Sequence, residues 1–161
     1  MTENTFRAGV GRVTITPPLT APHASWGAQV HVLPDGVESD LWATALVVDD
    51  GETRAAWIDL DIVIVTTPES DAIRARVGEE LGIPPEAVRV SVTHNHAGPP
   101  PSAWNWTRQG QAALEGYYAL LPEMAAGAAR LALQGMRPAR VLAGSGESRV
   151  AVNRRENGPD G

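Results

Sequence analysis

Residues 88–99 read VRVSVTHNHAGP, and this stretch sets our expectation for how the chain folds. Apolar and polar residues alternate over residues 88–93, which predicts a β-strand. Two of the four histidines, His94 and His96, stand at its end, before a Gly-Pro pair that breaks the strand. Residues i and i+2 of a strand point to the same face, so the two imidazoles should converge on one metal ion or one substrate.

The chemistry of the histidine pair favours a metal site, because neutral imidazole is a common protein ligand for zinc. The alternative is two polar side chains that hydrogen-bond to the backbone where a strand ends. The pair cannot form a catalytic zinc site by itself, since such a site needs about three protein ligands and an open position. Any further ligands must lie elsewhere.

Outward from this stretch, the sequence predicts a mixed β-sheet with crossover helices, an α/β domain. The predicted helix follows Thr67, its expected N-cap, and stops at Gly82. In the second helix Pro122 either produces a kink or starts a new helix. The expected strands are 7–16, 41–48, 54–65, 88–93 and 138–145, and the expected helices are 68–81 and 111–134.

The composition excludes several classes of protein. The chain has 161 residues, enough for one domain with a core, and a net charge of −6, which argues against nucleic-acid binding. It has no cysteine, so thiolate ligands and thiol nucleophiles are excluded. No apolar run approaches a membrane span, and the N-terminus lacks the pattern of a signal peptide. If Met1 is the true start, we expect a cytoplasmic protein.

Other residues are candidates for a site around the histidines. Asp59, at the end of a predicted strand, could accept the second N–H of a ligating histidine and fix its tautomer. Trp104 and Trp106 follow the histidines and either wall an apolar substrate pocket or pack as a lid. Arg154 could bind a carbonyl oxygen or an anion, or belong to a solvated basic cluster.

Several segments, in their order, resemble the N-terminal catalytic region of the neutral/alkaline (non-lysosomal) ceramidase family. The resemblance implies a zinc-dependent amidase that cleaves the N-acyl bond of ceramide. It assigns zinc ligation to His94, a catalytic or substrate-binding role to His96, and substrate contact to Arg154. The matching segments are 9–17 (GVGRVTITP), 36–37, 41–45, 58–59, 93–99 (THNHAGP) and 152–154 (VNR).

The family's remaining zinc ligands and its serine nucleophile lie further downstream in its sequences. The resemblance therefore implies that residues 1–161 form the incomplete N-terminal portion of a larger catalytic domain, inactive and a poor binder of Zn2+ by itself. Ala97, the stretch Pro99-Pro100-Pro101 and Arg155 depart from the family's pattern. These departures argue against restricting the substrate to ceramide, so we expect ceramide or a related small-molecule lipid amide. The alternatives are a hydrolase of a different amide or ester, and a non-catalytic binding or scaffold domain of the same fold.

Overall fold

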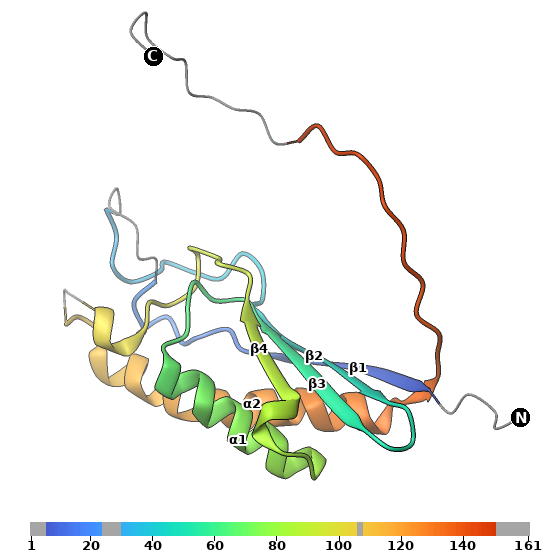
Figure 1. The fold of residues 1–161 in the computed structure, drawn as a ribbon. Helices are drawn as coiled ribbons and strands as arrows, with labels where there is room; N and C mark the ends of the chain where they lie inside the picture. Colours follow the sequence, from blue (N-terminus) through green and yellow to red (C-terminus); the bar gives the residue numbers. More distant parts are fainter. Residues whose placement is uncertain (1–5, 24–29, 106–107, 151–161) are drawn as a thin grey trace, which may run out of the picture.

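The computed structural model describes residues 6–23, 30–105 and 108–150 (Figure 1). Its centre is a five-stranded sheet in the order β4-β3-β2-β1-β5, in which only β3 and β4 are parallel. The predicted α/β class with a mixed sheet is confirmed. The elements are β1 (Arg7–Thr14), β2 (Trp42–Asp49), β3 (Arg54–Leu60), α1 (Thr67–Leu81), β4 (Val88–Val92), α2 (Gln111–Gln134) and β5 (Arg137–Pro138).

Helix α1 makes the crossover between the parallel strands β3 and β4. Its N-cap is Thr66, one residue before the predicted cap, and the Thr66 amide donates to the Glu69 carboxylate at 2.7 Å. This contact satisfies an amide that the helix itself leaves unbonded. The helix stops at Gly82, as predicted, because that residue adopts a left-handed conformation with φ 65°.

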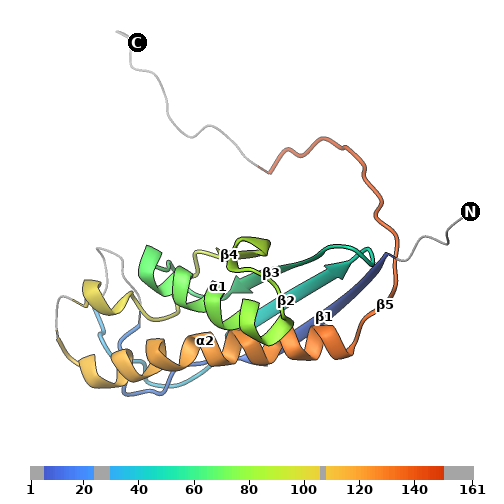
Figure 2. The same ribbon diagram turned by 60° about the horizontal axis from the view of Figure 1, so that its bottom comes forward.

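Helix α2 lies along the sheet and covers β1 and β2 (Figure 2). It is continuous through Pro122, so the prediction that a second helix could start there is wrong. A Cβ built on Gly11 of β1 would lie 2.2 Å from the carbonyl oxygen of Ala128, and one on Gly9 would lie 2.0 Å from that of Ala132. Glycine at these two positions therefore allows the helix to approach the strand this closely.

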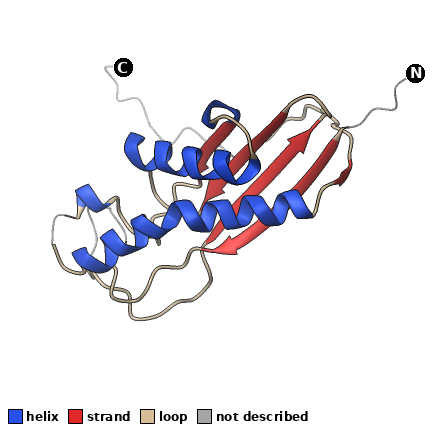
Figure 3. Cartoon of the chain, turned by 90° about the horizontal axis from the view of Figure 1, so that it is seen from below, coloured by secondary structure: helices blue, strands red, loops and turns tan. Residues whose placement is uncertain are grey.

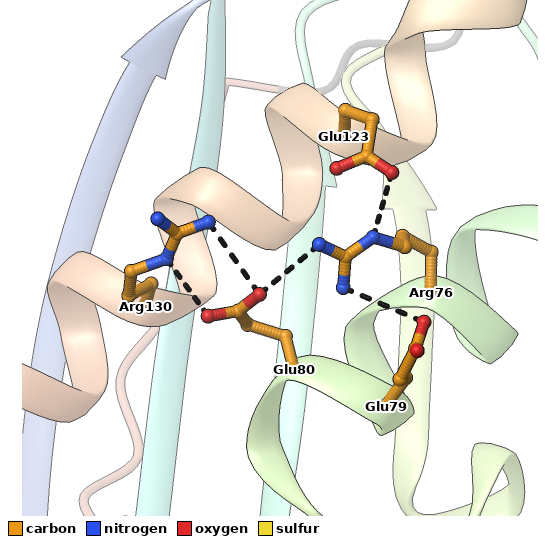
Figure 4. Close-up of polar contacts among 5 residues, drawn as sticks. All are labelled: Arg76, Glu79, Glu80, Glu123 and Arg130. Atoms are coloured by element: carbon orange, nitrogen blue, oxygen red, sulfur yellow. Dashed lines mark hydrogen bonds and ion pairs between the residues drawn. The ribbon is translucent and has the colours of Figure 1, made fainter.

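The helices α1 and α2 lie side by side on the same face of the sheet (Figure 3). Charged side chains join them at the surface: Arg76 Nε donates to Glu123 at 2.7 Å, and Arg130 Nε donates to Glu80 at 2.8 Å (Figure 4). Glu80 also pairs with Arg76, at 3.2 Å. One carboxylate of α1 is thus shared by guanidinium groups from both helices.

The core lies between the helices and one face of the sheet, and it includes Ile58, Leu60, Ile73 and Leu121. The other face carries Val10, Leu46 and Trp57, which are cross-strand neighbours and partly exposed. In the described residues no helix is both long enough and apolar enough to cross a membrane.

The strand predicted over 138–145 is wrong beyond its first residue. Strand β5 comprises only Arg137 and Pro138, and residues 139–150 follow without regular structure. Strand β5 pairs with β1 in the antiparallel sense, and the last hydrogen bond between the two segments runs from Ala139 N to Phe6 O. Residues after Ala139 extend beyond the first described residue of β1. Val141 and Leu142 are exposed because no neighbouring strand pairs with them in the described part of the chain. A β-pattern forms a strand only where it finds a ladder partner.

Candidate functional site

The histidines lie at the carboxyl end of the two parallel strands, where the chain leaves β3 and β4 side by side. Parallel pairing continues past the strand ends, since Thr93 N donates to Leu60 O at 3.0 Å and Asn95 N donates to Ile62 O at 3.3 Å. This end of an α/β sheet is where such folds place their ligands. The connection from β3 to α1 therefore forms one wall of the histidine loop.

His94 is held by the backbone of that connection. Its Nδ1 lies 2.8 Å from the carbonyl oxygen of Val63. A carbonyl can only accept, so Nδ1 carries the hydrogen of the neutral ring and Nε2 keeps its lone pair. His94 also has φ 59°, an uncommon conformation for a residue other than glycine. Strained residues of this kind concentrate at functional sites.

His96 faces His94, with 3.3 Å between their Nε2 atoms. The ring centroids are 4.8 Å apart and the rings are nearly perpendicular, at 88°. The expected convergence of the two imidazoles is present, although the backbone route differs from the expected strand. Strand β4 ends at Val92, and the left-handed turn at His94 brings the two rings together.

Two residues that sequence reasoning did not single out shape the histidine loop. The Asn95 carboxamide oxygen accepts a hydrogen bond from Ala97 N at 2.7 Å, which fixes the backbone between the two histidines. Asn commonly bonds the backbone two residues ahead, so this contact could have been anticipated. The contact with the Val63 carbonyl could not have been anticipated, because a backbone acceptor leaves no signal in the sequence. Gly98 then packs closely, with 3.3 Å between its ideal Cβ position and Asp61 O.

We expected Asp59 to accept the second N–H of a ligating histidine, but the carbonyl oxygen of Val63 accepts the N–H of His94 instead. Asp59 lies opposite Ser91 in the β3–β4 ladder and accepts a hydrogen bond from the Ser91 hydroxyl at 2.7 Å. It is therefore several residues before the histidines along the strand direction. Asp61 accepts from Trp42 N at 3.0 Å and anchors the start of β2.

The other candidates lie on the loop after the histidines or outside the described residues. Trp104 ends a short 3-10 turn, Ser102–Trp104, and is 45% exposed. The next residue, Asn105, is buried and donates to Gln109 O and the Gln111 side chain, which ties this loop to the start of α2. Trp106 and Arg154, both predicted to contact substrate, lie outside the described residues.

The histidine pair suits a metal ion in part. Two imidazole nitrogens bound tetrahedrally to zinc at about 2.0 Å lie about 3.3 Å apart, and the two Nε2 atoms have this spacing. Across residues 6–23, 30–105 and 108–150, however, no group of three or more His, Cys, Asp or Glu side chains could hold a metal. The described residues thus supply at most two donors, and a zinc site needs further ligands from outside them.

The fold is similar to that of solved ceramidases. It matches a crystal structure of neutral ceramidase from Pseudomonas aeruginosa with a TM-score of 0.66 and 17% sequence identity, and a structure of a ceramidase complexed with C2 with the same values. Each match covers 84% of this chain and 22% of the ceramidase chain, so the chain spans about a fifth of the length of those proteins. No protein-family model and no curated protein matches the sequence. At this identity the similarity establishes the fold.

Proposed function

We propose that residues 1–161 form the N-terminal part of the catalytic domain of a zinc-dependent hydrolase. Its substrate is the N-acyl amide of a lipid, either ceramide or a related compound. His94 is a zinc ligand, His96 acts on the substrate, and Arg154 contacts the substrate. The ceramidase fold of the two solved neighbours, together with the THNHAGP segment, supports this proposal.

The observation that carries the proposal is the orientation of the His94 ring. Val63 O holds Nδ1 in its protonated form, which leaves Nε2 as a donor atom at the open end of the sheet. Metal-binding histidines in proteins nearly always have this kind of support at the second nitrogen. A histidine with a purely structural role would not need Nε2 to face a second imidazole in an exposed loop.

His94, His96 and Arg154 each have a separate role in the proposed amide hydrolysis. A zinc ion held by His94 supplies Lewis-acid activation of a carbonyl or of water. His96 takes a proton from the attacking group or returns one to the leaving nitrogen, the usual role of a histidine general acid–base. Its Nε2, 3.3 Å from that of His94, is close enough to the ligand atom for this task. Arg154 stabilises the negative charge that develops on the amide oxygen.

The test uses the protein in its longest natural form, so that all ligands are available. Zinc content is measured by mass spectrometry, and fatty-acid release is measured from N-acyl lipids. We expect His94→Ala to lose both zinc and activity. His96→Ala should keep zinc and lose roughly 100-fold to 10,000-fold in rate, the typical contribution of a general acid–base. His31→Ala replaces an exposed histidine to which the proposal gives no role. It is the matched control and should change neither.

A His94→Ala protein with stoichiometric zinc would overturn the ligand assignment. A substrate panel decides the chemistry of the reaction. Ceramides, shorter N-acyl amines and the corresponding esters are compared, and preference for an ester or for a substrate without an acyl tail would replace the lipid amidase with another hydrolase. A wild-type protein that binds no zinc and hydrolyses none of them would favour a non-catalytic domain of the same fold.

A further inference from the structure

A hollow of about 380 Å³ lies beside the histidine loop and separate from the imidazole pair. The loop between β1 and β2 forms most of its wall, and Asn95 and Ala97 complete it. These two residues alternate along the chain with His94 and His96, whose rings face one another. The volume is within the range of small-molecule sites, about 300–1,000 Å³.

The wall of this hollow is largely apolar and open to solvent. Leu19 is 45% exposed and Val37 is 53% exposed, while Leu41 forms a buried part of the wall. Exposing large apolar side chains to water in an open concave surface costs free energy. A ligand with an aliphatic part removes that cost when it covers them. The hollow therefore suits an alkyl chain.

The charge of the hollow selects the other end of the ligand. Asp35 and Glu38 line it, and none of the described lining residues is Lys or Arg. No ion pair to either carboxylate occurs in the part of the chain that the structure describes. An ammonium group placed there gains two favourable charge interactions, and a carboxylate placed there is repelled.

We propose that this hollow is a binding site for a cationic amphiphile, an alkyl chain that ends in a protonated primary amine. The chain packs against Leu19, Val37 and Leu41, and the ammonium group lies toward Asp35 and Glu38. The site needs neither a metal nor hydrolysis, so it stands apart from the proposed catalytic function. Its occupant contacts Asn95, whose bond to Ala97 N holds the backbone between the two histidines.

The test is an NMR titration of the 15N-labelled 161-residue chain without metal. The probes are n-octylammonium, n-octanol and n-octanoate, each below its micelle concentration. We expect amide shifts at Gly36, Val37, Asn95 and Ala97, and affinities in the order ammonium, alcohol, carboxylate. Each methylene added between hexyl- and octylammonium should tighten binding roughly fourfold while the alkyl chain is buried. Added salt should weaken binding of the ammonium and leave that of the alcohol unchanged.

Two sets of variants separate charge from apolar contact. Asp35→Asn with Glu38→Gln should weaken octylammonium about fivefold to tenfold at low salt, and should no longer favour it over octanol. Glu52→Gln with Glu86→Gln removes the same number of charges elsewhere and should keep the preference. Leu19→Ser should weaken all three probes alike.

Three results would overturn the proposal. They are equal affinity for octylammonium and octanoate in the wild-type chain, shifts confined to the exposed sheet face around Leu46 and Trp57, and an equal loss in the control pair. The affinities of the three probes for the wild-type chain test the proposal even if a variant does not fold. Failure here would leave the zinc hydrolase proposal untouched, because no zinc or hydrolysis enters the measurement.

Discussion

The backbone carbonyl oxygen of Val63 lies 2.8 Å from Nδ1 of His94, so the connection after β3 orients a ring at the end of β4. The two segments are neighbours because β3 and β4 pair in parallel and leave the sheet at the same end. The tautomer of His94 is therefore a consequence of sheet topology.

This contact predicts the tautomer of His94. At a pH where the ring is neutral, long-range 1H–15N NMR spectra should show a protonated Nδ1 and an unprotonated Nε2, because only an N–H can donate to the Val63 carbonyl. His94→Ala identifies the resonances by their loss. A neutral His94 with its proton on Nε2 would contradict the geometry on which the zinc assignment depends.

The close approach of α2 to β1 predicts a large effect of a single methyl group. Gly11→Ala places a Cβ 2.2 Å from Ala128 O, so the helix must shift. We expect the free energy of unfolding to fall by about 1–3 kcal/mol, as in other overpacked sites. Urea titration measures this change.

Gly116→Ala is the matched control, since nothing lies within 4 Å of a Cβ at that position in α2. It should raise the free energy of unfolding by about 0.5–1 kcal/mol, because alanine favours the helix over glycine. Equal stability of the Gly11→Ala protein and the wild type would show that α2 does not pack this closely on β1.

The ion pairs between α1 and α2 predict a pH dependence of stability. The hydrogen bond from Arg76 lowers the pKa of Glu123 below its ordinary value. A carboxyl whose pKa is lowered by folding stabilises the folded state above its unfolded pKa, about 4.3, and this contribution is lost as pH falls through the folded pKa. Glu123→Gln should therefore lower the melting temperature at pH 7 and converge with the wild type below about pH 4.

Calorimetry from pH 3 to pH 7 measures this convergence. Glu86→Gln, an exposed carboxylate on another turn, should show no such trend. The difference between Glu123→Gln and the wild type should also shrink in high salt, which screens exposed charges. A difference that is constant from pH 3 to pH 7 would mean that the carboxylate charge has no role at this helix pair.

The two tyrosines predict the alkaline behaviour of the chain, since both are buried in α2. Burial raises the pKa of Tyr117 and of Tyr118 well above the ordinary value of 10. A raised pKa means that the stabilising effect of the neutral form is present below about pH 10 and is lost as pH rises toward the folded value. Absorbance of tyrosinate should therefore appear only as the chain unfolds, in step with the circular dichroism signal. Ionisation near pH 10 in a folded chain would place at least one ring at the surface.

Local patterns were enough to predict most of the elements of this fold. Helix α2 begins and ends where the sequence indicates, and Gly82 ends α1, because periodicity and caps act within a few residues. The alternation around Val90 correctly predicted β4, and the position of His94 and His96 just after it identified the candidate site.

Tertiary structure decided what depends on residues far apart in the sequence. From the sequence alone, Asp59 was the expected acceptor for the second N–H of a histidine. The parallel register instead puts Asp59 beside Ser91 and brings Val63 beside His94. The apolar run after Pro138 lacked a described strand to pair with and remained irregular. Composition, caps and periodicity are local properties of the chain. Register, ring orientation and the hollow beside Asn95 exist only after β3, β4 and the β1–β2 loop have packed together.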